Sequence, residues 1–333
     1  MTNTERPRQR GVALLTVLLV AALASVLAVS MITRQHLSIA KTRQVVHGQQ
    51  ALEYALGAET WVRGLLRADL EEDESVPPVD SLADRWAQTE APMEIDNGAL
   101  QIRVRDLGGR LNLNAVNDAA GVDRLGRLLS ALGLDPLLAE RVRDWTDEDQ
   151  EVAGSGAEDG RYLLEAPSYR TANAPFASVT ELRLLAELDE EAYLRLLPHV
   201  AALPPAVRRI NVNTATGAVL AALAPGMDAQ RMAAYTQPEA PWSTPQELIA
   251  REVGFAPEAG VLATRSDWFE VLVRADYGSQ SVTLRSIVHR DPETGRTHVV
   301  GRDLGQHFDS WADGGADRDD GDDAPALPDL EAP

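Results

Sequence analysis

A run of acidic side chains in the middle of the chain has the spacing of an oxygen-ligand metal site. Asp147, Asp149 and Glu151 occupy alternate positions, and Glu158 lies eleven residues after Asp147. These residues match positions 1, 3, 5 and 12 of an EF-hand loop, where carboxylate oxygens surround calcium. The spacing therefore predicts a calcium site in this segment.

The match to an EF-hand is incomplete. Position 6 of such a loop is glycine, and this chain has Val152 there. Asp144 and Asp159 flank the run closely enough to supply further ligands. Clustered carboxylates repel one another, so a loop this acidic is hard to order without a cation. The alternative is a solvated acidic loop that holds no ion.

No other combination of residues predicts chemistry. The chain has no cysteine, which excludes disulfides, thiolate catalysis and cysteine zinc sites. Its six histidines form no HxxxH or HxH pair, which argues against a histidine zinc site. Ser168, Asp189 and His199 are accompanied by neither a nucleophile elbow nor a glycine-rich phosphate loop. We therefore expect no enzymatic activity.

The overall charge argues against general binding of nucleic acids. The 333 residues include 31 Lys and Arg against 51 Asp and Glu, a net charge of −20. Because a nucleic-acid duplex is itself a dense line of negative charge, a chain with this balance is a poor partner for it. The apolar fraction of 44% is ordinary for a globular protein, so most of the chain is expected to fold.

The N-terminal part predicts one long helix that begins in a membrane. Residues 12–32 carry no charge, and this length gives about 31 Å of helix, close to the thickness of a bilayer core. Basic residues precede this segment, so the N-terminus is expected to stay in the cytoplasm and the rest to cross. We expect residues 12–33 to span the membrane and residues 34–68 to continue the helix beyond it. A cleaved signal peptide ending near Ala24 is the alternative.

Alternating apolar and polar residues predict an antiparallel sheet. Residues 99–105 alternate within a segment, 69–109, that otherwise predicts a surface connection. Three similar stretches lie within residues 266–302 and are separated by short turns, which predicts a β-meander. One early strand and three late strands around a helical middle predict an α+β fold.

The helical middle, residues 110–265, carries a weak internal duplication. The segment RLNLNAVN at residue 110 is echoed by RINVNTAT at residue 209, and each precedes an Ala/Leu-rich helix. We expect two similar helical units, about 110–200 and 205–265. These units also resemble helix–hairpin–helix units that bind DNA backbones through main-chain N–H groups and basic side chains. The alternative is that the asparagines cap helices and fix turns.

The C-terminal end has the composition of a disordered tail. Residues 303–333 include ten acidic residues and one basic residue, Arg318, together with several Gly and Pro. Such a segment buries too little apolar surface to offset the entropy lost on ordering. We expect it to be solvated.

The basic leader that ends in Gly11, followed by the apolar helix, resembles the class III signal of type IV pilins and pseudopilins. The resemblance implies that prepilin peptidase cleaves between Gly11 and Val12 and that the new terminal amine is methylated. Most pilins have glutamate five residues after the cleavage site, and this chain has Thr16. The absence of this glutamate suggests a subunit that does not dock beneath an existing subunit.

Four motifs in the body extend this resemblance over residues 12–305. They are DWTDEDQE from residue 144, GAEDGRYL from residue 156, YRTANAP from residue 169 and SVTELRLL from residue 178. In this order they resemble the minor pseudopilin K family of type II secretion systems. The family resemblance implies a pilin-like helix and sheet carrying a large helical domain made of two SAM-like or helix–hairpin–helix-like units.

The same resemblance implies a function, a location and a set of partners. It implies a tip subunit of the periplasmic pseudopilus, held in the inner membrane, that supports export of folded proteins. The implied partners are minor pseudopilins of the I and J types, the major pseudopilin and prepilin peptidase, and no nucleic acid. Calcium binding is implied near the acidic run, by Asp144, Asp147, Asp149, Glu151, Glu158 and Asp159.

Two other functions remain open from the residues alone. The first is a membrane-tethered DNA-binding protein of a DNA-uptake system, which the helix–hairpin–helix resemblance would support. The second is a secreted calcium-binding module with an ordinary signal peptide. Salt-sensitive DNA binding would favour the first, and a mature N-terminus near Ser25 would favour the second.

Overall fold

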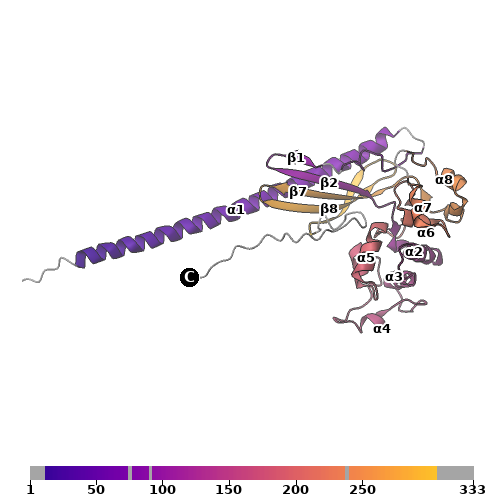
Figure 1. The fold of residues 1–333 in the computed structure, drawn as a ribbon, viewed down its shortest axis with the longest axis horizontal. Helices are drawn as coiled ribbons and strands as arrows, with labels where there is room; N and C mark the ends of the chain where they lie inside the picture. The colour runs from indigo at the N-terminus through magenta and orange to yellow at the C-terminus, as the bar shows by residue number, and fades with distance from the viewer. Residues whose placement is uncertain (1–11, 74–76, 90–91, 237–239, 306–333) are drawn as a thin grey trace, which may run out of the picture.

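A computed structural model describes residues 12–73, 77–89, 92–236 and 240–305. One long helix forms a stem, a twisted sheet packs along its C-terminal half, and a helical domain lies beyond the sheet (Figure 1). The prediction of an α+β fold with a long N-terminal helix, an antiparallel sheet and a helical domain is confirmed. The leader and most of the acidic tail lie outside the described residues.

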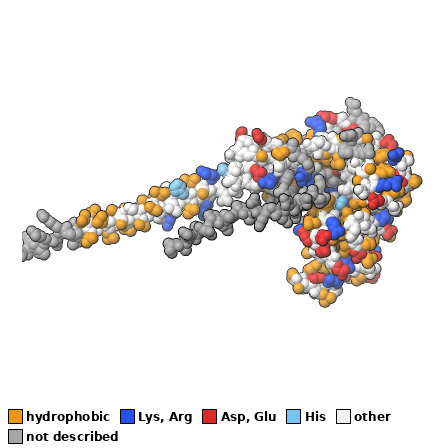
Figure 2. Space-filling view, in the orientation of Figure 1, with side chains coloured by type: hydrophobic (Ala, Val, Ile, Leu, Met, Phe, Trp, Pro, Cys, Tyr) orange, Lys and Arg blue, Asp and Glu red, His pale blue; other side chains and the backbone are white. Residues whose placement is uncertain are grey.

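The stem is helix α1, Val12–Glu72, which is 61 residues long. It continues through Gly48, Gly57 and Gly64 without interruption and ends four residues beyond residue 68, the predicted end of the helix. Residues 14–46 are exposed, and Figure 2 shows hydrophobic side chains along this end of the stem. Among the described residues, this helix is the one long and apolar enough to cross a membrane.

The sheet has five antiparallel strands in the order β1-β2-β7-β8-β9. Burial alternates along β2, as the sequence predicted, because one face of that strand covers the stem. An apolar core lies between the sheet and the stem, and the stem contributes the buried residues Ala51, Ala55, Val62 and Leu66 to it. The strands are β1 Met93–Ile95, β2 Gly98–Asp106, β7 Trp268–Tyr277, β8 Gln280–Arg290 and β9 Thr297–Asp303.

The inserted domain lies between β2 and β7 and has one continuous apolar core. Two short parallel strand pairs, β3–β4 and β5–β6, add to the predicted helices. The α-helices are α2 Ala119–Ala131, α3 Leu138–Thr146, α4 Asp159–Tyr162, α5 Glu190–Leu196, α6 Gly217–Leu223, α7 Ala229–Ala233 and α8 Pro245–Arg251. The strands are β3 Leu111–Asn112, β4 Val200–Ala201, β5 Ile210–Asn211 and β6 Leu262–Ala263. Short 3₁₀ turns cover Leu113–Ala115, Val179–Leu184, Leu197–His199 and Val253–Glu258.

The asparagines of the duplicated motif make equivalent bonds in the two halves. Asn114 accepts a hydrogen bond from the Phe176 amide at 2.7 Å and donates to two carbonyl oxygens. Asn213 accepts one from the Trp242 amide at 2.8 Å and likewise donates to carbonyl oxygens. Both side chains are buried. They satisfy backbone groups of loops that would otherwise be unpaired inside the domain.

The connection between stem and sheet differs from the predicted surface segment. Asp80, Ser81 and Trp86 are almost completely buried. Trp86 packs edge-on against Phe269 of β7, with ring centroids 5.3 Å apart. The prediction of a surface connection is therefore wrong for this part, because the segment folds back into the space between α1 and the sheet.

Candidate metal centre

The acidic run of the sequence surrounds one point between α3 and α4. Asp144 lies in the last turn of α3, and Asp147 is the residue at which that helix ends. Asp149 follows in the loop, and Glu158 immediately precedes α4. One carboxylate oxygen from each of Asp147, Asp149 and Glu158 lies within 4.8 Å of the others. The loop thus gathers three carboxylates that are up to eleven positions apart in the sequence.

Several oxygens at this point are buried without a hydrogen-bond partner. They are Oδ1 of Asp144, Oδ1 of Asp147 and Oε1 of Glu158. A buried oxygen without a partner is costly, and buried polar atoms in native proteins nearly always have one. Hard cations such as calcium take six to eight oxygen ligands, so these atoms are of the kind that such an ion needs.

Three carboxyl groups in this region have raised pKa values. Burial, together with repulsion from neighbouring carboxylates, raises the pKa of Glu158 to about 7 and that of Asp144 to about 6. The same causes raise the pKa of Asp147. A divalent cation at this point would remove the repulsion, so the donor set fits calcium.

Two predicted ligands have a different environment. Glu151 is exposed and does not belong to the group of close carboxylates. Asp159 is engaged by the Arg170 guanidinium and by the amide and hydroxyl of Thr171. The structure therefore brings three of the six predicted residues, Asp147, Asp149 and Glu158, to one point. Asp144 is close enough to raise the pKa of Glu158, while Glu151 and Asp159 lie at the edge.

Asn173 is a candidate ligand that the sequence analysis did not assign. Its amide Oδ1 is buried and has no partner, while its Nδ2 donates to the carbonyl of Asp149 at 2.8 Å. The residue has a left-handed backbone, with φ of 44°, a conformation that asparagine tolerates better than most residues. It lies in the YRTANAP motif, which marked the family, but nothing in the motif indicated that Asn173 could bind a metal ion.

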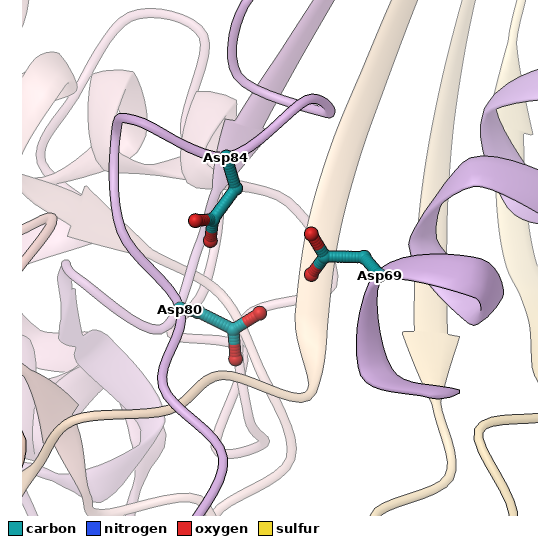
Figure 3. Close-up of side chains that lie close together, drawn as sticks. All are labelled: Asp69, Asp80 and Asp84. Carbon is teal, nitrogen blue, oxygen red and sulfur yellow. The ribbon is translucent and has the colours of Figure 1, made fainter. Parts of the chain in front are cut away.

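A second acidic group lies at the end of the stem. Asp69 from α1 points toward Asp80 and Asp84 from the connection (Figure 3), and their carboxylate oxygens lie within 4.8 Å of one another. The buried guanidinium of Arg290 donates to both oxygens of Asp80 at 2.6 Å. Because an arginine already neutralises part of this charge, the group is an ion-pair cluster and we assign no cation to it.

The predicted processing site falls at the edge of the described residues. Gly11 and the rest of the leader lie outside them, and Val12 is the first residue of α1. Thr16, at the position of the pilin glutamate, lies in the first turns of that helix.

Comparison with known proteins identifies the family. Two family models described as type II secretion system protein K match residues 109–205 and 210–267. Type II secretion system protein K of Pseudomonas aeruginosa is 38% identical over 322 residues, which cover 90% of this chain and 94% of that relative. The protein of the same name from Klebsiella pneumoniae is 39% identical, over 66% of this chain and 71% of its own.

A solved structure agrees with the sequence comparison. A chain in the crystal structure of the GspK–GspI–GspJ complex from the enterotoxigenic Escherichia coli type II secretion system aligns with a TM-score of 0.71 and 26% identity. The alignment covers 80% of this chain and all of the other. With its stem, sheet and inserted helical domain, the chain belongs to the type II secretion system protein K family of minor pseudopilins.

Proposed function

We propose that this minor pseudopilin is the tip and initiator subunit of the periplasmic pseudopilus. The proposal rests on the positions of the apolar stem and the inserted domain at opposite ends of the molecule. The apolar, exposed half of α1 forms one end of the molecule, and the inserted domain lies at the other end, beside the C-terminus of the stem (Figure 1). A domain in that place obstructs the addition of another subunit above it.

The stem holds the chain in the inner membrane as a single span. Its apolar side chains stay exposed in the isolated chain, so they need lipid or the stems of other subunits to cover them. Basic residues before the span keep the N-terminus in the cytoplasm, which places the sheet and the inserted domain in the periplasm. Prepilin peptidase is expected to cleave between Gly11 and Val12.

The proposed partners are minor pseudopilins of the I and J types, followed by the major pseudopilin. The related chain of known structure is found in a complex with two such proteins. Packing between stems in the membrane is favourable when apolar surfaces interdigitate. Thr16 in place of a carboxylate fits a subunit whose stem does not need to pair with the terminal amine of a subunit above it.

Calcium is the proposed ion of the metal centre. Asp144, Asp147, Asp149 and Glu158 would supply oxygen ligands, with Asn173 as a further donor. The ion would neutralise the mutual repulsion of these groups and fix the loop between α3 and α4 against the rest of the inserted domain. Its role is then structural, in keeping with a subunit that forms contacts.

We propose no enzymatic role. Of the residues that would make a hydrolase triad, Asp189 caps α5 by accepting a bond from the Ala192 amide. His199 Nδ1 lies 2.7 Å from the hydroxyl of Thr216, which caps α6. Burial, with the charge of Arg110, lowers the pKa of His199 to about 4. Asp189 therefore caps one helix, and His199 contacts the residue that caps another.

The test is co-purification from membranes. The tagged full chain, extracted in mild detergent, is expected to bring two further pilin-like proteins with it. A variant with Leu23→Arg in the stem should lose them, and the matched control Glu53→Arg, at an exposed position beyond the membrane, should keep them. Recovery of the chain without pilin-like partners, together with salt-sensitive DNA binding, would instead support the DNA-uptake function.

A further inference from the structure

The inserted domain is joined to the sheet by two chain crossings and by apolar contacts. The chain leaves the sheet after Asp106, the last residue of β2, and returns at Trp268, the first residue of β7. Leu107, Ala201 and Leu203 form a small apolar cluster there, with Trp268 and Ile287 packed against it. Apolar contacts hold surfaces together but are non-directional, so they do not by themselves fix an angle.

A buried arginine supplies directional contacts on the stem side. Arg290, the last residue of β8, is fully buried, and its Nη1 donates to the carbonyl of Leu66 at 3.1 Å. The same nitrogen lies 3.4 Å from the carboxylate of Asp69, near the end of α1. Nη2 donates to both oxygens of Asp80 and, at 2.8 Å, to the carbonyl of Ser266. One guanidinium therefore joins the stem, the connection and the returning chain.

Asp80 extends this contact toward the inserted domain. Its carboxylate accepts a hydrogen bond from the Ser266 amide at 2.8 Å, and its own amide donates to the carbonyl of Thr264 at 2.9 Å. Its carbonyl accepts from Nδ2 of Asn211, the last residue of β5, at 3.1 Å. Asp80 thus bonds to both Arg290 and the second helical unit.

Asp106 completes the connection. Its buried carboxylate accepts hydrogen bonds from the hydroxyls of Ser266 and Thr214, and from Nδ2 of Asn211 at 3.1 Å. The amide of Gly108 is a fourth donor, at 2.6 Å. Three of these donors go to Oδ2 and the Gly108 amide goes to Oδ1. Two of the donors, Asn211 and Thr214, belong to the second helical unit.

We propose that this polar network, Asp69–Arg290–Asp80–Ser266–Asp106–Asn211–Thr214, fixes the angle of the inserted domain relative to the stem. Arg290 is its positioning residue, because its guanidinium reaches both the end of α1 and the returning chain. Hydrogen bonds have narrow angular preferences, so a chain of them specifies an orientation that the apolar contacts leave free. Every residue of the network belongs to this chain.

The orientation is measurable because the chain has no cysteine of its own. Glu53→Cys on the stem and Ser130→Cys on α2 place spin labels at two exposed positions. Both helical units share one core, so α2 reports on the whole inserted domain. Electron–electron double resonance on the full chain in detergent gives the distribution of distances between the labels. We expect a narrow distribution that becomes clearly wider after Arg290→Met.

The matched control is Arg302→Met, which removes the same charged group from an ion pair between the stem and β9. It should leave the distribution narrow, since Arg302 does not contact the network. If Arg290→Met fails to fold, Ser266→Ala with Thr214→Val removes two donors to Asp106 while keeping every charge, and should also widen the distribution. A folded variant of either kind with the wild-type width would overturn the proposal.

Discussion

Glu59 of α1 and Arg302 of β9 form a bidentate ion pair that joins the stem to the sheet. The Arg302 Nε and Nη2 atoms lie 2.7 and 2.8 Å from the two carboxylate oxygens. Glu59 is buried and also accepts a bond from the hydroxyl of Ser286, while Arg302 remains about half exposed. Burial alone would raise the pKa of Glu59, but Arg302 and Ser286 outweigh it and keep that pKa below its usual value.

We predict that Arg302→Met lowers the free energy of unfolding by about 2 kcal/mol, because it leaves a buried carboxylate without its cation. The exposure of Arg302 reduces the loss from the larger value expected for a fully buried pair. The double variant Glu59→Leu with Arg302→Met should recover most of the loss. Thermal unfolding of the full chain checks both, and a double variant less stable than the single one would contradict the account.

Calcium is predicted to raise the melting temperature of the wild-type chain. Asp147→Ala with Asp149→Ala should abolish the rise, because it removes two of the three carboxylates that converge at the metal centre. The control Asp96→Ala with Asp123→Ala removes the same charge from exposed positions outside that centre and should leave the rise intact. A wild-type chain whose melting temperature is unaffected by both calcium and chelator would disprove calcium binding.

Asn173 provides a second test of the same centre. Asn173→Ala removes an unpartnered buried oxygen and the bond that orients the Asp149 backbone. We expect the calcium concentration needed for half of the thermal effect to increase roughly 10–100-fold, the usual consequence of losing such a contact. Titration followed by thermal unfolding measures it. An unchanged midpoint would exclude Asn173 from the site.

The acidic group at the end of the stem predicts a pH dependence. Burial, with repulsion from Asp84 and Asp80, raises the pKa of Asp69 to about 7. Asp69 therefore binds a proton more readily in the folded chain than in the unfolded chain. Its contribution to the free energy of unfolding falls as pH rises from about 4 to about 7. Asp69→Asn should reduce the difference in melting temperature between about pH 5 and about pH 8. The same difference in wild type and variant would refute this assignment.

Local patterns were sufficient to predict the stem, four of the five strands of the sheet and the acidic run, but not β1. Each depends on neighbours in the sequence, such as the uncharged segment after Gly11 or the alternation in β2. The carboxylates of Asp147 and Asp149 come together because a short loop confines them. A pattern of this kind is visible without knowledge of the tertiary fold.

The burial of Asp80 was not predictable in the same way. It lies among Asp, Glu, Ser and Pro residues, a composition typical of surface segments, and its partner Arg290 is 210 positions away. The orientation of Asn173 depends likewise on the path of the loop between α4 and the turn that follows. Single-sequence patterns do not specify such long-range polar pairings, which form only when the whole fold is in place.

Helix α1 is expected to remain part of the mature protein and to join it to the membrane and to other stems. Mass analysis of the N-terminus of the chain isolated from membranes tests it most directly. We predict a mature chain that begins at Val12 with a methylated amine and stays in the membrane fraction. A soluble mature chain that begins near Ser25 would contradict the account.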